Sequence, residues 1–123
     1  MKPLILCAVA AAALTMTATA ALADQCSYKT SDSLATDPGQ ILLMMDSKTA
    51  LKTKLEDSHL SFRNVYFCKT PRDQISMTCG EVKSGRTGKG YVRFLSNGRA
   101  DVTVWDGDGK NGFESAWNRF CKP

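Results

Sequence analysis

The 123-residue chain has one histidine, His59, and no cysteine pair in Cys-x-x-Cys spacing. Both absences argue against a metal site, because zinc sites are built from closely spaced cysteine and histidine ligands. Long hydrophobic runs are also missing, since the apolar stretch Leu4–Ala13 falls short of the roughly 20 residues that span a bilayer. The sequence therefore predicts no metal site, no cofactor and no membrane anchor.

The chain also lacks a strong charge of either sign. Its net charge is +4, too weak to indicate a nucleic acid or a membrane surface as partner. The charge is unevenly spread, however: residues 24–57 hold four basic and six acidic side chains, and residues 58–123 hold eleven and six. A cationic surface is therefore expected in the C-terminal part.

The first 23 residues follow the order of a signal peptide. A basic start at Lys2 precedes the apolar stretch, and small residues lead to Ala21-Leu22-Ala23, the pattern of a cleavage site before Asp24. Cys26 does not directly follow that site, so no lipoprotein anchor is expected. We expect residues 1–23 to be removed and residues 24–123 to form one exported domain, periplasmic or secreted.

Four cysteines remain in the expected mature chain: Cys26, Cys68, Cys79 and Cys121. In a short exported domain an even number of cysteines indicates disulfides, and four cysteines allow three pairings. We favour Cys68–Cys79 across a hairpin that turns at residues 70–73, with Cys26–Cys121 joining the chain ends. On the chain-entropy model the terminal bridge would contribute about 4.7 kcal/mol and the short hairpin bridge less than about 3 kcal/mol, so the terminal bridge should matter more.

The pattern of apolar residues indicates an α+β fold. Residues 24–39 are polar and are interpreted as a lead-in loop, whereas Ile41 to Leu55 shows near-helical apolar spacing, with Met44 and Met45 as core filler. Short β-rich runs follow at residues 60–69, 75–83, 90–95 and 100–105, with an Asn-Gly turn signal at residues 96–99.

The last segment, Phe113 to Phe120, has its aromatic residues on one helical face, and Asn111 is positioned to cap it with Glu114 as partner. We therefore expect one N-terminal helix on an antiparallel sheet of three or four strands, closed by a short C-terminal helix and two disulfides.

The best candidate recognition surface is the basic, glycine-rich hairpin over residues 83–90. It is not a phosphate-binding loop of the GxxxxGK[ST] type, but its cations and backbone N–H groups suit an acidic partner. The candidate partner-binding residues are Lys83, Arg86, Lys89, Tyr91, Arg93 and Arg99. The sequence thus predicts a small binding or accessory protein that recognises an unknown protein or an anionic polymer of the cell envelope.

The alternative function is a small hydrolase that uses Asp106 and Asp108, with or without a metal. The loop 106–112 alternates acidic residues with glycines, but it fails the EF-hand pattern because Lys110, Asn111 and Trp117 occupy positions that need other residues. Two aspartates in a glycine-rich loop are more often turn formers. No catalytic residue is therefore assigned.

Four short motifs in the last third of the chain carry a resemblance: Cys79-Gly80-Glu81-Val82, Gly90-Tyr91, Val92-Arg93-Phe94 and Trp117-Asn118-Arg119-Phe120-Cys121. With these motifs the chain resembles a family of small exported alphaproteobacterial proteins. Those proteins have an Asn-rich link after the valine, where this chain has Lys83-Ser84. The resemblance implies export from a Gram-negative cell and a terminal-cysteine framework, and it implies no site.

Overall fold

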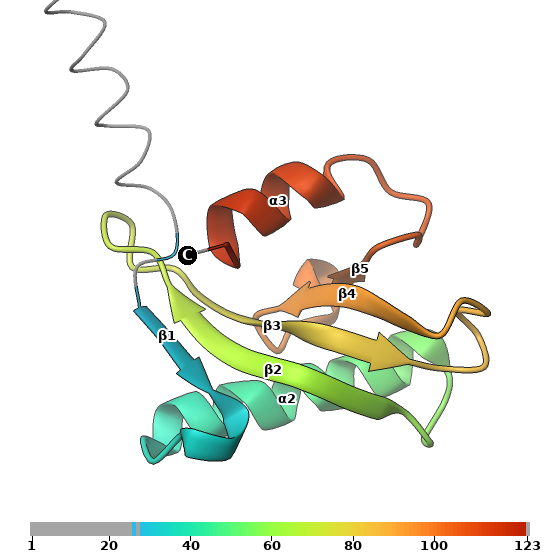
Figure 1. The fold of residues 1–123 in the computed structure, drawn as a ribbon, viewed down its shortest axis with the longest axis horizontal. Helices are drawn as coiled ribbons and strands as arrows, with labels where there is room; N and C mark the ends of the chain where they lie inside the picture. Colours follow the sequence, from blue (N-terminus) through green and yellow to red (C-terminus); the bar gives the residue numbers. More distant parts are fainter. Residues whose placement is uncertain (1–25, 27, 123) are drawn as a thin grey trace, which may run out of the picture.

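The structure is a computed structural model that describes Cys26 and residues 28–122. The predicted signal peptide lies outside this range. The described residues form an α+β fold with one five-stranded antiparallel sheet, in which the spatial order of the strands is their order in the sequence (Figure 1). The strands are β1 (Tyr28–Ser31), β2 (Ser61–Lys69), β3 (Ser76–Lys83), β4 (Tyr91–Ser96) and β5 (Val104–Trp105); the helices are α2 (Pro38–Leu55) and α3 (Phe113–Phe120), with 3-10 turns at Asp32–Leu34 and Ala100–Val102.

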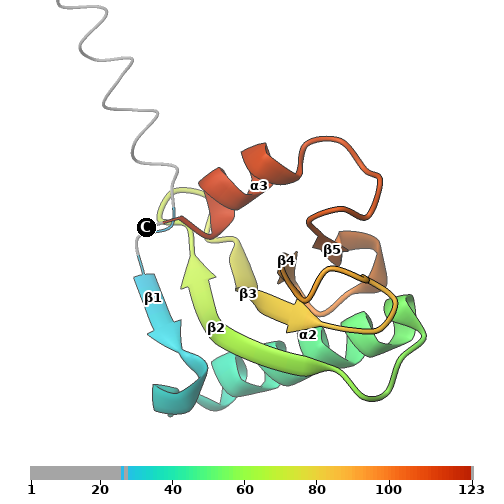
Figure 2. The same cartoon turned by 45° about the vertical axis from the view of Figure 1, so that its right-hand side comes forward.

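The sheet lies between the two helices, α2 against one face and α3 above the other (Figures 1 and 2). Consecutive residues of β2 alternate between the two faces, as the period of a strand requires. Val65 and Phe67 join the core under α2, whereas Tyr66 and Cys68 join the core under α3. Each face of the central strands therefore has its own apolar core.

The helix predicted from Ile41 begins three residues earlier, at Pro38. The Asp37 carboxylate accepts hydrogen bonds from the backbone N–H groups of Gly39 (2.8 Å) and Gln40 (3.2 Å), and Pro38 occupies the first helical position. This is a complete N-terminal cap. Met44 is buried as predicted, but the prediction for Met45 is wrong, because its side chain is 58% exposed.

Two segments differ from the sequence-based expectation. The predicted lead-in loop contains β1, which pairs with β2 and brings the sheet to five strands instead of three or four. The predicted strand 100–105 is a 3-10 turn followed by the two-residue β5, because Thr103 is buried and bonds back to the carbonyl of Arg99 (2.6 Å).

The helix Phe113–Phe120 has the expected bounds, but its N-cap is Gly112 and no side chain caps it, so the assignment to Asn111 is wrong.

The centre of the sheet depends on Gly80. A Cβ atom there would lie 3.0 Å from the Cα atom of Val65 and 3.1 Å from the ring of Phe94, so no larger residue fits without moving the backbone. Val65 approaches this closely because β2 has a bulge between Arg63 and Tyr66. The neighbouring carboxylate of Glu81 fixes that bulge, accepting hydrogen bonds from both Arg63 (3.2 and 3.3 Å) and Asn64 (2.7 Å).

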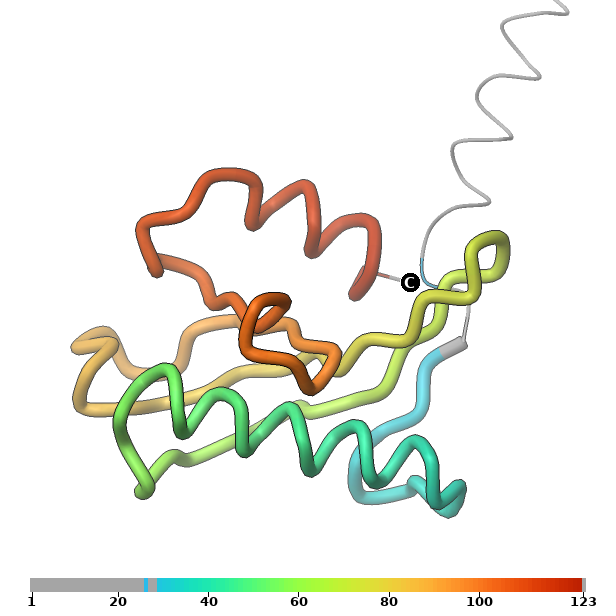
Figure 3. The backbone as a smooth tube through the Cα atoms, turned by 180° about the vertical axis from the view of Figure 1, so that it is seen from behind, coloured from blue at the N-terminus to red at the C-terminus, as the bar shows by residue number. Residues whose placement is uncertain are grey.

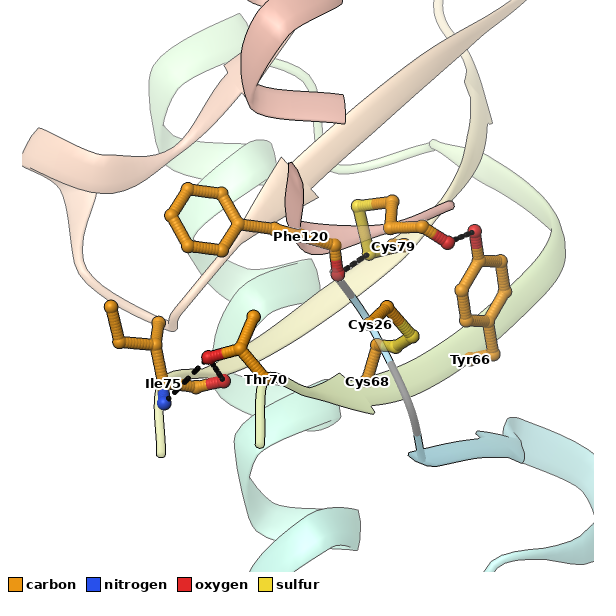
Figure 4. The surroundings of a disulfide bond; sticks show 8 residues. Cys26, Tyr66, Cys68, Thr70, Ile75, Cys79 and Phe120 are labelled. Carbon is orange, nitrogen blue, oxygen red and sulfur yellow. Dashed lines mark hydrogen bonds between the residues drawn. A yellow bond between two sulfur atoms is a disulfide. The ribbon is translucent and has the colours of Figure 1, made fainter. Parts of the chain in front are cut away.

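The predicted disulfide pairing is wrong. The bridges are Cys26–Cys68 and Cys79–Cys121, each with a sequence separation of 42 residues (Figure 4). In the hairpin, Cys68 faces Met77 across the β2–β3 ladder, because the connection from Lys69 to Ser76 sets a register two residues from the expected one. Cys68 and Cys79 therefore share a face of the sheet but bond to different partners.

The two bridges fasten the two ends of the described chain to the sheet. Cys26 precedes β1 and Cys121 follows α3, and each bonds to one of the two longest strands, β2 and β3. Beside them the Tyr66 hydroxyl donates a hydrogen bond to the Cys121 carbonyl (2.7 Å; Figure 4). Burial raises the pKa of Tyr66 to about 12, so this hydroxyl stays protonated and a donor even at alkaline pH.

Removing either disulfide should cost about the same stability. Both bridges close loops of equal length, so the chain-entropy model assigns each about 4 kcal/mol. The expectation that the terminal bridge contributes more depended on the wrong pairing and no longer applies. Denaturant unfolding of Cys26→Ser/Cys68→Ser and Cys79→Ser/Cys121→Ser checks the equality.

The two variants should differ locally. Only the loss of Cys79–Cys121 should abolish hydrogen-exchange protection in α3, because none of the eight residues of this helix is fully buried. Equal protection of α3 in both variants would contradict this interpretation, as would a non-reduced peptide map that links Cys68 to Cys79.

Candidate functional site

Three segments that are distant in the sequence meet at one end of the molecule. They are the C-terminal end of α2, the β3–β4 hairpin loop 84–90 and the loop that follows β5 (Figures 1 and 3). Together they enclose a cleft of about 370 Å³. Its lining residues include Lys54, Glu56, Arg86, Thr87, Lys89, Trp105, Asp106 and Asp108. The basic hairpin and the acidic loop, two separate candidates in the sequence, are thus opposite sides of one site.

The hairpin loop 84–90 is ordered by hydrogen bonds. The buried Ser84 donates a hydrogen bond to the Asp57 carboxylate (2.8 Å) and accepts one from the backbone N–H of Arg86 (3.0 Å). The Thr87 hydroxyl donates back to the Ser84 carbonyl (2.9 Å). Hydrogen bonds from the backbone of His59 and from Ser84 lower the pKa of Asp57, so this anchor stays ionised. The loop is therefore held against the α2–β2 connection.

The cations of the cleft have few partners. Arg86 approaches Glu56 at 3.8 Å, but both side chains are largely exposed, so the pair is weak. The ammonium group of Lys89 lies beside Gly107, 3.8 Å from where a Cβ atom would stand if this residue had one. Within the described part of the chain Lys89 forms no ion pair. These two side chains can exchange solvent for a bound anion at little cost.

Lys54 is the cation that the sequence reasoning missed. Its ammonium group donates to the Thr103 carbonyl (3.0 Å) and lies 6.0 Å from the centre of the Trp105 ring. Burial lowers its pKa, and the nearby Lys110 ammonium lowers it further. Helical spacing alone assigns Lys54 to the solvent side of α2, and no sequence signal connects that face to Trp105.

The acidic side of the cleft does not form a catalytic pair. The Asp106 carboxylate bonds to Arg93 (3.1 Å), and Asp108 accepts the backbone N–H groups of Lys110 (2.9 Å) and Trp105 (3.4 Å). Both carboxylates thus shape the loop. Among the residues that the structure describes, no group of three or more His, Cys, Asp or Glu side chains is placed to hold a metal ion.

Lys83 and Tyr91 do not line this cleft. They lie opposite each other on β3 and β4, and Tyr91 is covered by the guanidinium of Arg63, 4.0 Å from its ring centre. Arg99 lies beyond the other end of β4 and pairs with Asp101 (3.2 Å). Of the six predicted partner-binding residues, the structure brings only Arg86 and Lys89 together around the cleft.

Arg93 has a structural role rather than a ligand-binding one. Its guanidinium bonds to both Asp106 and Glu114 (3.1 and 2.5 Å), and it lies 5.2 and 5.1 Å from the rings of Phe113 and Trp117. These ion pairs raise its pKa. The side chain therefore clamps α3 and the loop after β5 onto β4, which makes it a support of the cleft rather than one of its ligand-binding cations.

The residues of the motifs that carry the family resemblance also have structural roles. Cys79 and Cys121 form a bridge, Gly80 permits the close approach at the bulge, and Val82 and Phe94 are fully buried. Arg119 pairs with Asp73 of the β2–β3 hairpin, which holds the end of α3. The motifs thus describe how this chain folds rather than what its cleft binds.

The comparisons with known proteins give no relative: no protein-family model, no curated protein and no solved structure matches the chain. In the described residues, no helix is long and apolar enough to cross a membrane. The arrangement of charged and aromatic side chains in the cleft is therefore the basis for a functional interpretation.

Replacing Arg93 by alanine should destabilise the protein by about 1–2 kcal/mol, because two charge-assisted hydrogen bonds and two ring contacts are lost at a partly exposed site. Arg99→Ala is the matched control, since its pair with Asp101 is exposed and local, and it should change stability by no more than about 0.5 kcal/mol. Equal melting temperatures for the two variants would contradict the clamp.

Proposed function

We propose that the protein is an exported binding protein that recognises an anionic partner through the cleft at the hairpin end of the sheet. The observation that carries this proposal is the convergence of Lys54, Arg86 and Lys89 on one cleft that Trp105 also lines. Their origin in two separate segments means that the fold, rather than a basic run, gathers the charge. Clefts of this volume, within the usual range of about 300–1,000 Å³, accept small ligands or one unit of a polymer.

Export is part of this proposal. The two disulfides indicate an oxidising compartment, since such bonds persist outside the reducing cytosol. The order of basic, apolar and small residues in the first 23 positions supports a cleaved signal peptide, with delivery to the periplasm or the medium.

The hydrolase alternative has less support. Acid–base chemistry needs a carboxyl group that is available to the substrate. The Asp106 carboxylate is already bonded to Arg93 and that of Asp108 to the loop backbone, and in the described residues neither belongs to a group of three or more side chains placed to hold a metal ion. Binding without chemistry is the function that this geometry favours.

The exported protein should begin at Asp24 and should contain no free thiol. Intact-mass analysis of protein collected from the periplasm or the medium, before and after reduction, checks both points. A mass that retains residues 1–23, or one that includes a lipid on Cys26, would refute the proposed processing.

The double variant Arg86→Gln/Lys89→Gln should bind short anionic polymers roughly tenfold more weakly or worse, because it removes two of the cleft's positive charges. The measurement is calorimetric titration with polyglutamate and with oligogalacturonate, each at low and at physiological salt.

The matched control is Lys52→Gln/Lys122→Gln, which removes the same charge from exposed positions outside the cleft. This control should bind like the original protein. Equal weakening in both double variants would show that net charge, and not the cleft, is recognised, and no binding of either polymer would refute the proposed function.

A further inference from the structure

The cleft is cationic, but it is not uniformly so. Glu56, Asp106 and Asp108 line it together with the three cations. A polyanion whose only polar side groups are carboxylates would meet these acidic side chains as well as the cations, and like charges in close contact repel. The cleft therefore suits a ligand in which each unit has one negative group for the cations and neutral hydroxyl groups that can donate to the carboxylates.

Trp105 adds an apolar surface to this polar site. The ring is half-buried and packs against the core under α2. Trp105 also pairs with Phe94 where β5 joins β4, so the sheet and the core fix the position of the ring. A rigid aromatic surface with polar groups around it is the usual contact for the C–H face of a sugar ring. An acidic peptide has no such face and would leave the Trp105 surface uncovered.

Lys54 marks the place for the negative group. Its ammonium group lies 6.0 Å from the centre of the Trp105 ring, and it lines the same cleft as Arg86 and Lys89. Asp108 also lines the cleft, but its carboxylate is already engaged by the loop backbone. A ligand anion beside Lys54 would therefore pair with a cation that has no carboxylate bound to it in the described residues. A singly charged carboxylate fits better than a doubly charged phosphate, because the three acidic side chains of the cleft repel the second charge more.

We infer that the ligand of this cleft is a carboxylate-bearing saccharide. Its sugar ring would lie on Trp105, its carboxylate beside Lys54, and its hydroxyl groups would donate hydrogen bonds to the carboxylates of the cleft. This inference rests on the proposed function and narrows it to one class of partner. It also gives the acidic loop a role in recognition, since Asp106 and Asp108 would accept hydrogen bonds from hydroxyl groups and would repel a chain that offers carboxylates without hydroxyls.

The test compares three probes on the mature, disulfide-bonded protein: oligogalacturonate, its uncharged methyl ester and polyglutamate of equal length. Oligogalacturonate should bind roughly tenfold more tightly than polyglutamate, and the methyl ester should not bind measurably. The chain has two tryptophans, so the indole N–H signals in a proton–nitrogen NMR spectrum report the contact directly. Oligogalacturonate should shift the Trp105 signal and leave the Trp117 signal in place.

Trp105→Phe should weaken oligogalacturonate binding roughly tenfold, and Tyr91→Phe, at a ring outside the cleft, should leave it unchanged. Lys54→Met should abolish the preference for oligogalacturonate over its methyl ester. If polyglutamate binds as tightly as oligogalacturonate, or if the Trp105 signal does not move, the saccharide inference is wrong while the anion-binding proposal survives. If none of the probes binds, both are wrong.

Discussion

The position of α3 depends on the bond between Cys79 and Cys121, and the cleft depends on α3. An eight-residue helix is too short to be stable alone, and none of the side chains of this one is fully buried. The disulfide fixes its C-terminal end to the centre of the sheet, and the Arg93 clamp fixes its N-terminal end together with the loop after β5. That loop is one wall of the cleft. A covalent bond at one end of α3 therefore decides the geometry at the other end.

The distribution of charge shows why a basic segment is a poor guide to a binding surface. Residues 83–99 have five cations in the sequence, yet the fold sends them to different places. Arg93 holds α3, Arg99 pairs with its neighbour Asp101, and Lys83 lies on the sheet beside Tyr91. The hairpin loop keeps two cations for the cleft, and α2 adds Lys54 from another segment. The site is assembled by the packing of α2 against the sheet rather than by the local sequence.

Local patterns predicted most elements correctly because the signals for them are local. The bounds of α3 follow from its apolar spacing, and the three long strands lie within one residue of their predicted ends. The prediction failed where a distant contact decides the structure. β1 is a polar edge strand that forms only against β2, and the segment 100–105 bends because Ser96 and Thr103 share a buried hydrogen bond of 2.6 Å. The disulfide pairing failed for the same reason, since the β2–β3 register places Met77, and not Cys79, opposite Cys68.

The sequence by itself determined the α+β class, the two helices, the central strands and the presence of four cysteines able to form two bridges, because composition and periodicity encode burial along the chain. Only the tertiary structure decided which cysteines pair, which cations are free and which aromatic ring accompanies them. Those features depend on strand register and on the packing of helices against a sheet, which bring together residues 50 or more positions apart, as with Lys54 and Trp105. No periodic pattern within one segment records such a contact, so the candidate site became visible only in the folded chain.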